Sequence, residues 1–227
     1  MKEYGFPSLK EYLALAQEVV AAIRQGGREL CAQNPEFAKA MRYLEIKLQN
    51  RTAQGFEFNS FLKSNIDDAV HPVQVGGSVR FSGGKLKFHS YWINIYGSKE
   101  KKAENKVQFR VHFDVAIPEE DKNKKKHPLY HVQLGGRLRE TQYVNKDMNS
   151  WSVPRIPYVP ISLGLFLEIV LRELAGDCAK GFLKSNAWCH IISRNQKMIL
   201  SPLSRIVRNP ASKTIATVYY EGFDKEN

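Results

Sequence analysis

The chain has 227 residues, a formal net charge of +11, 43% hydrophobic residues and 25% charged residues. This length and composition are typical of a single globular domain and exclude a disordered or collagen-like chain. The three cysteines form no Cys-x-x-Cys pair, which argues against a disulfide framework and against a zinc ribbon. We therefore expect a reducing compartment, the cytoplasm or a eukaryotic nucleus, with no bound metal and no cofactor.

No segment of the sequence is predicted to cross a membrane. Residues 1–8 lack an apolar run behind a basic start, so no signal peptide is expected there. The longest apolar stretch, residues 161–171, contains Glu168 and is followed by Arg172. It is too short and too charged to span a bilayer, and we expect it to be a core helix.

The first part of the chain is predicted to be helical. Apolar residues recur there at three- and four-residue spacing behind Ser8, and Glu11 completes the capping-box pattern with that serine. A second helix is expected after Asn34, with Pro35 at its first position. From these signals we assign residues 1–66 to a helical N-terminal part.

The middle part of the chain is predicted to be an antiparallel sheet, over residues 73–134. Strict alternation of apolar and polar residues over 107–117 marks a strand with one buried face. Residues 82–85, Ser-Gly-Gly-Lys, predict a hairpin turn, and a change of phase in the following strand predicts a bulge near Ser90. Together with a short strand at 129–134, this gives a meander of about four strands.

The last third is predicted to return to helices. A crossing segment over 135–160 contains prolines at three-residue spacing, and a long helix is expected over 161–183. A last strand is expected at 214–220, within a helical, basic part that covers 161–227. The whole chain, 1–227, is therefore predicted to be one α+β domain whose meander sheet is packed by N-terminal and C-terminal helices.

Residues 178–220, within the C-terminal part, carry most of the net charge. From residue 178 to residue 220 there is no acidic side chain and there are seven basic ones. An unopposed basic region favours contact with a phosphate backbone, and Trp188 in the same region is a candidate for stacking on a base. The basic candidates for nucleic-acid contact are Lys180, Lys184, Arg194, Lys197, Arg205, Arg208 and Lys213.

Two strands carry residue types suited to acid–base chemistry. Alternation places His112 and Asp114 on one face of the strand over 107–117, together with Arg110, and His131 lies on the next strand. In a suitable register, two imidazoles would meet beside a carboxylate and could transfer protons at a phosphodiester. The competing interpretation is an ordinary polar face of a half-solvated sheet.

These observations leave three hypotheses for function. The first is a non-enzymatic nucleic-acid-binding protein, or a subunit of a nucleoprotein complex, that contacts DNA or RNA through the basic C-terminal part. The second is a protein–protein interaction subunit, in which residues 161–171 and the proline-containing crossing at 135–160 pack on a partner and nucleic acid plays no part. The third is a metal-independent phosphodiesterase or nuclease that uses the paired histidines. Phosphate-binding and dinucleotide-binding glycine motifs are absent, as is the Gly-x-Ser-x-Gly elbow.

Overall fold

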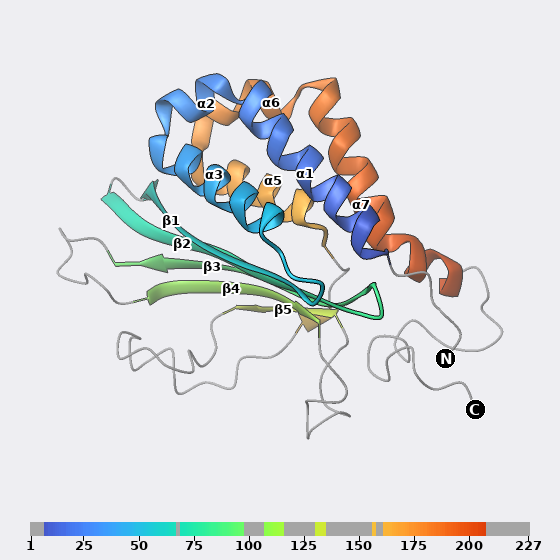
Figure 1. Ribbon diagram of the computed structural model, residues 1–227. Coiled ribbons are helices and arrows are strands. Elements are labelled where there is room, and N and C mark those ends of the chain that lie inside the picture. The colour runs from blue at the N-terminus through green and yellow to red at the C-terminus, as the bar shows by residue number, and fades with distance from the viewer. Residues whose placement is uncertain are drawn as a thin grey trace.

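Helices cover one face of an antiparallel sheet in the computed structural model, which describes residues 7–66, 69–97, 107–115, 130–134, 156–157 and 161–207 (Figure 1). The helices are α1 (Leu9–Gly26), α2 (Arg28–Gln33), α3 (Pro35–Gln49), α5 (Leu163–Leu174), the 3-10 helix η1 (Gly176–Ala179), α6 (Lys180–Leu183) and α7 (Asn186–Val207). The strands are β1 (Gly55–Ile66), β2 (Ala69–Ser82), β3 (Lys85–Tyr96), β4 (Val107–Val115), β5 (Tyr130–Leu134) and β6 (Ile156–Pro157). The predicted α+β class is confirmed.

The N-terminal helices begin where the sequence predicts. Ser8 caps α1 through its side chain, which accepts a hydrogen bond from the backbone N–H of Glu11 at 3.2 Å, and the Glu11 carboxylate accepts from the backbone N–H of Ser8 at 2.9 Å. The Asn34 side chain accepts from the N–H of Phe37 at the start of α3, with Pro35 in the first turn. None of the described helices is long and apolar enough to cross a bilayer.

The sheet is larger than predicted and begins earlier. Its strands pair in sequence order, each antiparallel to the next, as a meander from β1 to β6. The assignment of residues 1–66 to a helical part is wrong, because α3 ends at Gln49 and β1 occupies Gly55–Ile66. Its alternation is weak in the sequence, since an inward position carries Ser64 and the outward Phe61 is 60% exposed.

The hairpin between β2 and β3 follows its predicted turn. Gly83 and Gly84 have φ values of 58° and 72°, in the left-handed region that glycine occupies without strain. The predicted bulge is present but lies closer to the turn than Ser90. Arg80 pairs with Phe88 while the next residue of β2 pairs with Leu86, so that the extra residue is Lys87.

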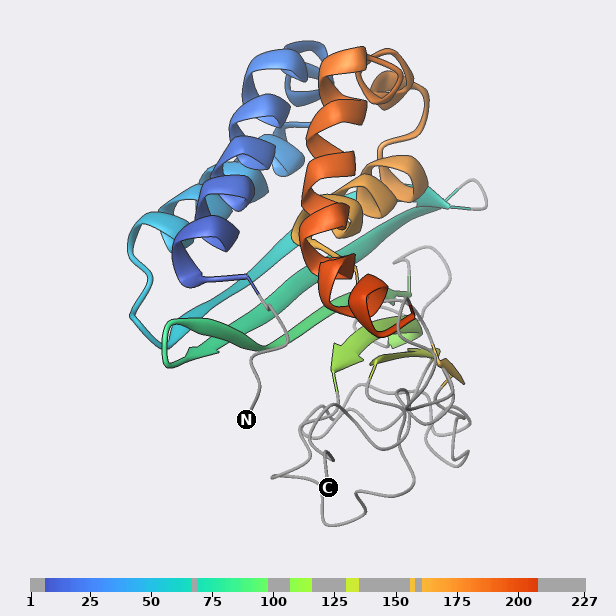
Figure 2. The same cartoon turned by 90° about the vertical axis from the view of Figure 1, so that its right-hand side faces the viewer.

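The core lies between the helices and the sheet and contains residues from both the N-terminal and the C-terminal helices. The hydroxyl groups of Tyr12 in α1 and Tyr91 in β3 are 2.6 Å apart and buried. The Tyr91 ring stacks on Phe166 of α5, with ring centroids 4.9 Å apart. Helices α1 and α7 pack side by side over the sheet (Figure 2), and the Asn195 side chain donates to the carbonyl of Leu15. One face of the sheet is therefore closed by apolar packing.

The long helix predicted over 161–183 is interrupted, since α5 ends at Leu174 and η1 and α6 follow as separate short pieces. Gly176 and Asp177 have low helix propensity, which accounts for the break. The apolar residues of α5, including Phe166 and Leu167, are buried in the protein's own core and so do not form the partner-binding surface that the second hypothesis placed at 161–171. The strand predicted at 214–220 lies outside the described residues.

Candidate functional site on the polar face of the sheet

The face of the sheet that points away from the helices carries rows of polar side chains. Directly paired residues of neighbouring antiparallel strands point to the same face, so each row can be followed through the strand register. One row consists of Glu57, Ser78, Ser90, Asp114 and His131, taken from β1 to β5 in turn. We refer to the side of the sheet that carries this row as the polar face.

A second row lies next to the first on the same face. It consists of Asn59, Gly76, Trp92, His112 and Gln133. A third consists of Phe61, Gln74, Asn94 and Arg110. Several polar side chains in these rows are less than one-tenth exposed, namely Ser78, Ser90, Asn94 and His131. Burial of polar groups is costly unless they are hydrogen-bonded, so a buried polar row marks a site with a specific role.

Asp114 lies at the centre of this site. One carboxylate oxygen accepts a hydrogen bond from the Ser90 hydroxyl, and the other lies 3.2 Å from Nδ1 of His112 and 4.0 Å from Nε2 of His131. Burial raises the pKa of Asp114, but the hydrogen bonds from His112 and Ser90 and the charges of both histidines outweigh it. The net result is a pKa below its usual value, so the carboxylate is ionised near neutral pH.

The contact with Asp114 fixes the tautomer of His112. An ionised carboxylate can only accept a hydrogen bond, so Nδ1 of His112 carries the hydrogen and donates a hydrogen bond to Asp114. The guanidinium of Arg110 lies 3.4 Å from the same nitrogen, close enough to add its positive charge to the site. Burial lowers the pKa of Arg110 to about 10, against the opposing effects of Asp114 and Tyr96. Arg110 remains a cation at neutral pH.

Three buried polar atoms on this face have no hydrogen-bond partner. Among the described residues, Asn94 Oδ1, Arg110 Nε and His112 Nε2 are buried and unpaired. Asn94 and Arg110 are directly paired across β3 and β4, and His112 is two residues further along β4, on the same face. Buried polar groups are almost always satisfied in folded proteins, so three unpaired atoms in one place make this part of the polar face a candidate for contact with a polar ligand or with water.

The catalytic candidates from the sequence therefore lie together. The structure brings His112 and His131 to the carboxylate of Asp114, with Arg110 beside His112. Sequence reasoning missed Ser90, although it lies at the position that direct cross-strand pairing with Asp114 requires. Within the described residues, no three His, Cys, Asp or Glu side chains are grouped in a way that could hold a metal ion.

The expectation for Trp188 is wrong. Its side chain is 1% exposed, and its ring packs on Phe182 with ring centroids 4.7 Å apart, so it cannot stack on a base. The signal was present in the sequence, because Trp188, Ile192, Asn195 and Ile199 recur at helical spacing and form the buried face of α7.

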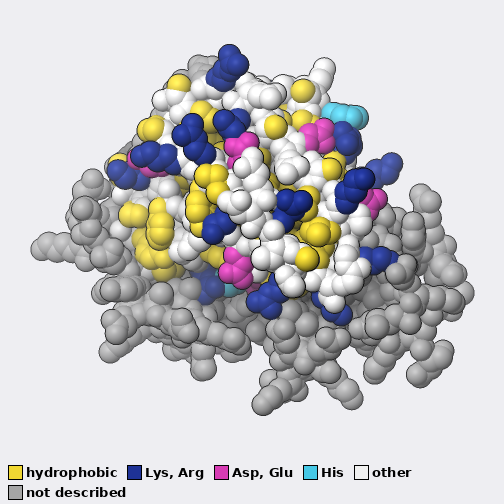
Figure 3. All heavy atoms as spheres, in the orientation of Figure 1, with side chains coloured by type: hydrophobic (Ala, Val, Ile, Leu, Met, Phe, Trp, Pro, Cys, Tyr) yellow, Lys and Arg dark blue, Asp and Glu magenta, His cyan; other side chains and the backbone are white. Residues whose placement is uncertain are grey.

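Of the basic candidates of the C-terminal part, four have described side chains, and one of these is paired with a carboxylate. Arg194 forms an ion pair with Glu18 of α1 at 2.8 Å, so an acidic residue from the other end of the chain partly neutralises it. Lys180, Lys184 and Lys197 are exposed on α6 and α7. The Lys and Arg side chains on the visible helical surface are dispersed, with Asp and Glu among them (Figure 3).

The remaining basic candidates cannot be placed on this surface. Arg205 lies in α7, but its side chain is outside the described set, and Arg208 and Lys213 lie beyond the described residues. Their assignment to nucleic-acid contact stays a prediction.

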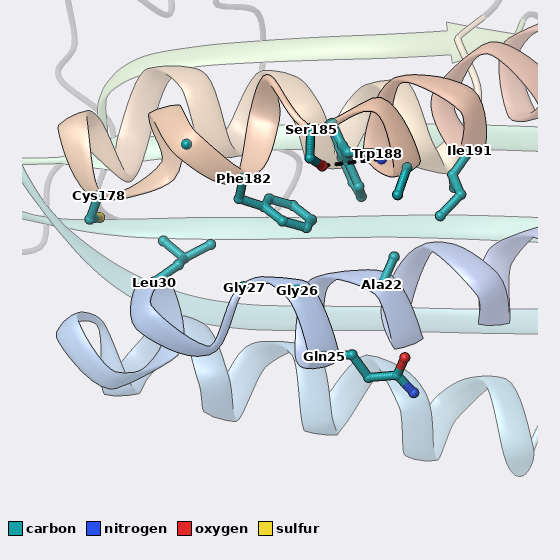
Figure 4. A pocket seen from close by; sticks show the side chains of 12 residues that line it. Ala22, Gln25, Gly26, Gly27, Leu30, Cys178, Phe182, Ser185, Trp188 and Ile191 are labelled. Atoms are coloured by element: carbon teal, nitrogen blue, oxygen red, sulfur yellow. Dashed lines mark hydrogen bonds between the residues drawn. The ribbon is translucent and has the colours of Figure 1, made fainter.

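The helical layer also contains a groove of about 820 Å³, between the α1–α2 corner and the α6–α7 corner (Figure 4). Phe182 and Trp188 form one wall and the backbone of Gly26 and Gly27 faces them. The described residues that line this groove carry no acidic or basic side chain. It therefore offers space but no acid–base chemistry, and the polar face is the stronger candidate.

The chain matches no protein-family model, and no curated protein and no solved structure is significantly similar to it. Its function has to be inferred from its own residues and contacts.

Proposed function

We propose that the protein is a metal-independent phosphodiesterase that cleaves nucleic acid, with His112 as general base and His131 as general acid. The observation that supports this most directly is the unpaired Nε2 of His112, on a ring whose Nδ1 is held by the ionised Asp114. A histidine that a carboxylate orients through one nitrogen is suited to accept a proton through the other.

The surroundings of His112 favour a substrate that is anionic and brings its own nucleophile. Among the described residues, no hydroxyl or thiol group is hydrogen-bonded to Nε2 of His112, so the attacking group comes from the substrate or from water. RNA carries such a group in its 2′-hydroxyl, next to a phosphate. Arg110 supplies a positive charge beside the site, and the net charge of +11 attracts a polyanion over longer distances.

The proposed reaction is an internal transfer within RNA. Nε2 of His112 takes the proton of a 2′-hydroxyl, whose oxygen forms a bond to the adjacent phosphorus. The bond from phosphorus to the 5′-oxygen breaks, and that oxygen receives a proton from His131. The products are a 2′,3′-cyclic phosphate and a free 5′-hydroxyl. Asp114 stabilises the positive charge that forms on His112, and Arg110 stabilises the charge on the phosphate oxygens.

The test is cleavage of an RNA oligonucleotide in the presence of EDTA, followed by separation of the products. We expect the wild type to cleave RNA, to leave the same sequence with 2′-deoxyribose intact, and to release a cyclic phosphate. His112→Gln should lower kcat/KM by about 10²-fold to 10⁴-fold, because general-base catalysis contributes about that much. His190→Gln, an exposed histidine on α7, is the matched control and should keep full activity. The proposal fails if the purified wild type cleaves no RNA, or if His112→Gln is as active as the control.

We propose a second, binding role for the basic C-terminal part. Lys184 and Lys197 are exposed, and the described residues from 178 to 207 carry no acidic side chain. Such a surface supports weak, salt-dependent attraction of a nucleic acid backbone. Because α7 covers the opposite side of the sheet from His112, this contact would be separate from the catalytic site.

A further inference from the structure

The indole ring of Trp92 lies against Gly76, in the middle of the polar face. Gly76 in β2 and Trp92 in β3 are directly paired. A Cβ atom built on Gly76 would lie 2.5 Å from two carbon atoms of the indole ring, which is far closer than any side chain permits. The φ angle of Gly76 is not in the left-handed region, so this glycine provides space for the ring rather than an unusual backbone.

Trp92 is also the direct neighbour of the proposed general base. It pairs with Gly76 on one side and with His112 on the other. Paired side chains on one face of an antiparallel sheet have Cβ atoms about 5 Å apart. From this position beside His112, the indole ring extends over Gly76 of β2. The indole is partly exposed, and part of its surface is in contact with Gly76.

A pair of aromatic side chains, Phe61 and Tyr96, lies further along the polar face. The ring of Phe61, which is 60% exposed, lies 6.3 Å from that of Tyr96, centroid to centroid. The side-chain oxygen of Gln74 accepts hydrogen bonds from the Tyr96 hydroxyl at 3.0 Å and from Nδ2 of Asn94 at 2.7 Å. The aromatic pair is thus connected to Asn94, one of the residues with an unpaired buried atom.

We infer that Trp92 stacks the nucleobase next to the phosphodiester that His112 attacks, and that the substrate is single-stranded RNA. This inference rests on the proposed function for its catalytic part. Aromatic side chains stack most readily on bases that are unpaired, so a partly exposed aromatic residue on the strand next to His112 favours a single strand. The exposed Phe61 offers a place for a second base.

Two measurements test the inference, and only one of them depends on catalysis. The first is binding of a 2′-O-methyl RNA oligonucleotide, which cannot be cleaved by the proposed reaction, compared with the same oligomer lacking one base. The second is kcat/KM on ordinary RNA, with and without the base next to the cleaved bond. The variants are Trp92→Leu and the conservative Trp92→Tyr, with Phe109→Leu as the control. Phe109 is an aromatic residue, 43% exposed, whose side chain lies on the opposite face of β4.

We expect Trp92→Leu to weaken binding of the complete single strand by about 5-fold to 100-fold, since one stacked base contributes about 1–3 kcal/mol. Binding of the oligomer without the base should change little, and Trp92→Tyr should restore part of the affinity. Gly76→Ala should mimic the loss, because the added methyl group displaces the indole from its position. Urea unfolding of each variant identifies any that has lost its fold. If Trp92→Leu does not fold, the affinities of Trp92→Tyr and the wild type are compared instead.

Equal losses for the oligomers with and without the base would overturn the inference, as would unchanged binding in Trp92→Leu. Base-dependent binding by a wild type that cleaves no RNA would instead refute the proposed function while leaving Trp92 as a base-stacking residue. The two failures are therefore distinguishable.

Discussion

The helical surface and the polar face of the sheet both carry charge, but they arrange it differently. On the visible helical surface, Lys and Arg side chains are dispersed among Asp and Glu, and Arg194 is partly neutralised by Glu18. On the sheet, a few charged groups converge on the single carboxylate of Asp114. The sequence draws attention to the helices because several cations follow one another there with no acidic residue between them, whereas the residues of the polar face are spread over five strands.

This difference shows that the density of charge along a sequence is a weak indicator of a site. Charges on a helix point in several directions, and carboxylates from distant segments pair with them. A site is better recognised by buried polar atoms that the fold leaves unpaired, as at Asn94, Arg110 and His112. The predictions below test the comparison from its largest expected effect to its smallest.

The largest effect is expected at Trp188, which sequence reasoning placed on the helical surface and the structure places in the core. Trp188→Ala should lower the free energy of unfolding by about 3–5 kcal/mol, because it removes a large buried side chain. Urea unfolding measures this change. The control is Ile46→Ala, at an exposed position of α3, which should lower the free energy of unfolding by about 1 kcal/mol or less. RNA binding by the folded variant should match the wild type. A variant that is as stable as the wild type but has lost RNA binding would show that Trp188 is exposed and contacts RNA.

The next effect concerns His89, which is buried beside Tyr91 on the helix side of the sheet, with ring centroids 5.4 Å apart. Burial lowers the pKa of His89 to about 4, against the opposing charge of Asp114. The unfolded chain therefore binds a proton more readily, with a pKa near 6.5. The stability that the neutral ring contributes is complete above pH 6.5 and is lost as pH falls towards 4, by about 3 kcal/mol.

His89→Gln should remove this part of the pH dependence, since glutamine stays neutral throughout. The measurement is urea unfolding between pH 4 and pH 7 for both proteins. Asp114 has a lowered pKa and also loses its stabilising effect in acid, so some pH dependence should remain in the variant. If the two proteins show the same pH dependence, His89 is not held neutral in the core.

The smallest effect is expected on the helical surface. Lys184→Glu combined with Lys197→Glu should change the free energy of unfolding by less than about 0.5 kcal/mol, because both side chains are exposed. If this surface contacts nucleic acid, binding weakens and its salt dependence becomes flatter, while cleavage of a short RNA is unchanged. Lys39→Glu with Arg42→Glu, exposed on α3, makes the same change in charge elsewhere. Equal losses in both double variants would show that net charge alone matters.

Local signals predicted much of the fold. The cap at Ser8, the start of α3 at Pro35 and the turn at Gly83 all depend on backbone chemistry within a few residues, and all three are present. Strand β1 was missed because its pattern is mixed, with the inward Ser64 and the outward Phe61 breaking the alternation. Packing against β2 and the helices, which the sequence does not display, overrides that weak local pattern.

The candidate site could be predicted only in part. Alternation correctly placed His112 and Asp114 on one face, but the position of His131 depends on the register between β4 and β5. Register is set by long-range pairing, so no local pattern specifies it. The role of Gly76 was equally hidden, because its partner Trp92 lies on another strand.

The glycine pair at the middle of β2 has a mechanical consequence. Gly76 and Gly77 lack side chains on opposite faces, and a Cβ on Gly77 would come within 2.7 Å of both Phe58 and Tyr91 on the helix side. Aromatic side chains thus pack directly on the backbone of β2 from both faces of the sheet. A change in packing at Tyr91 that displaced this part of β2 would therefore also displace Trp92 on the polar face.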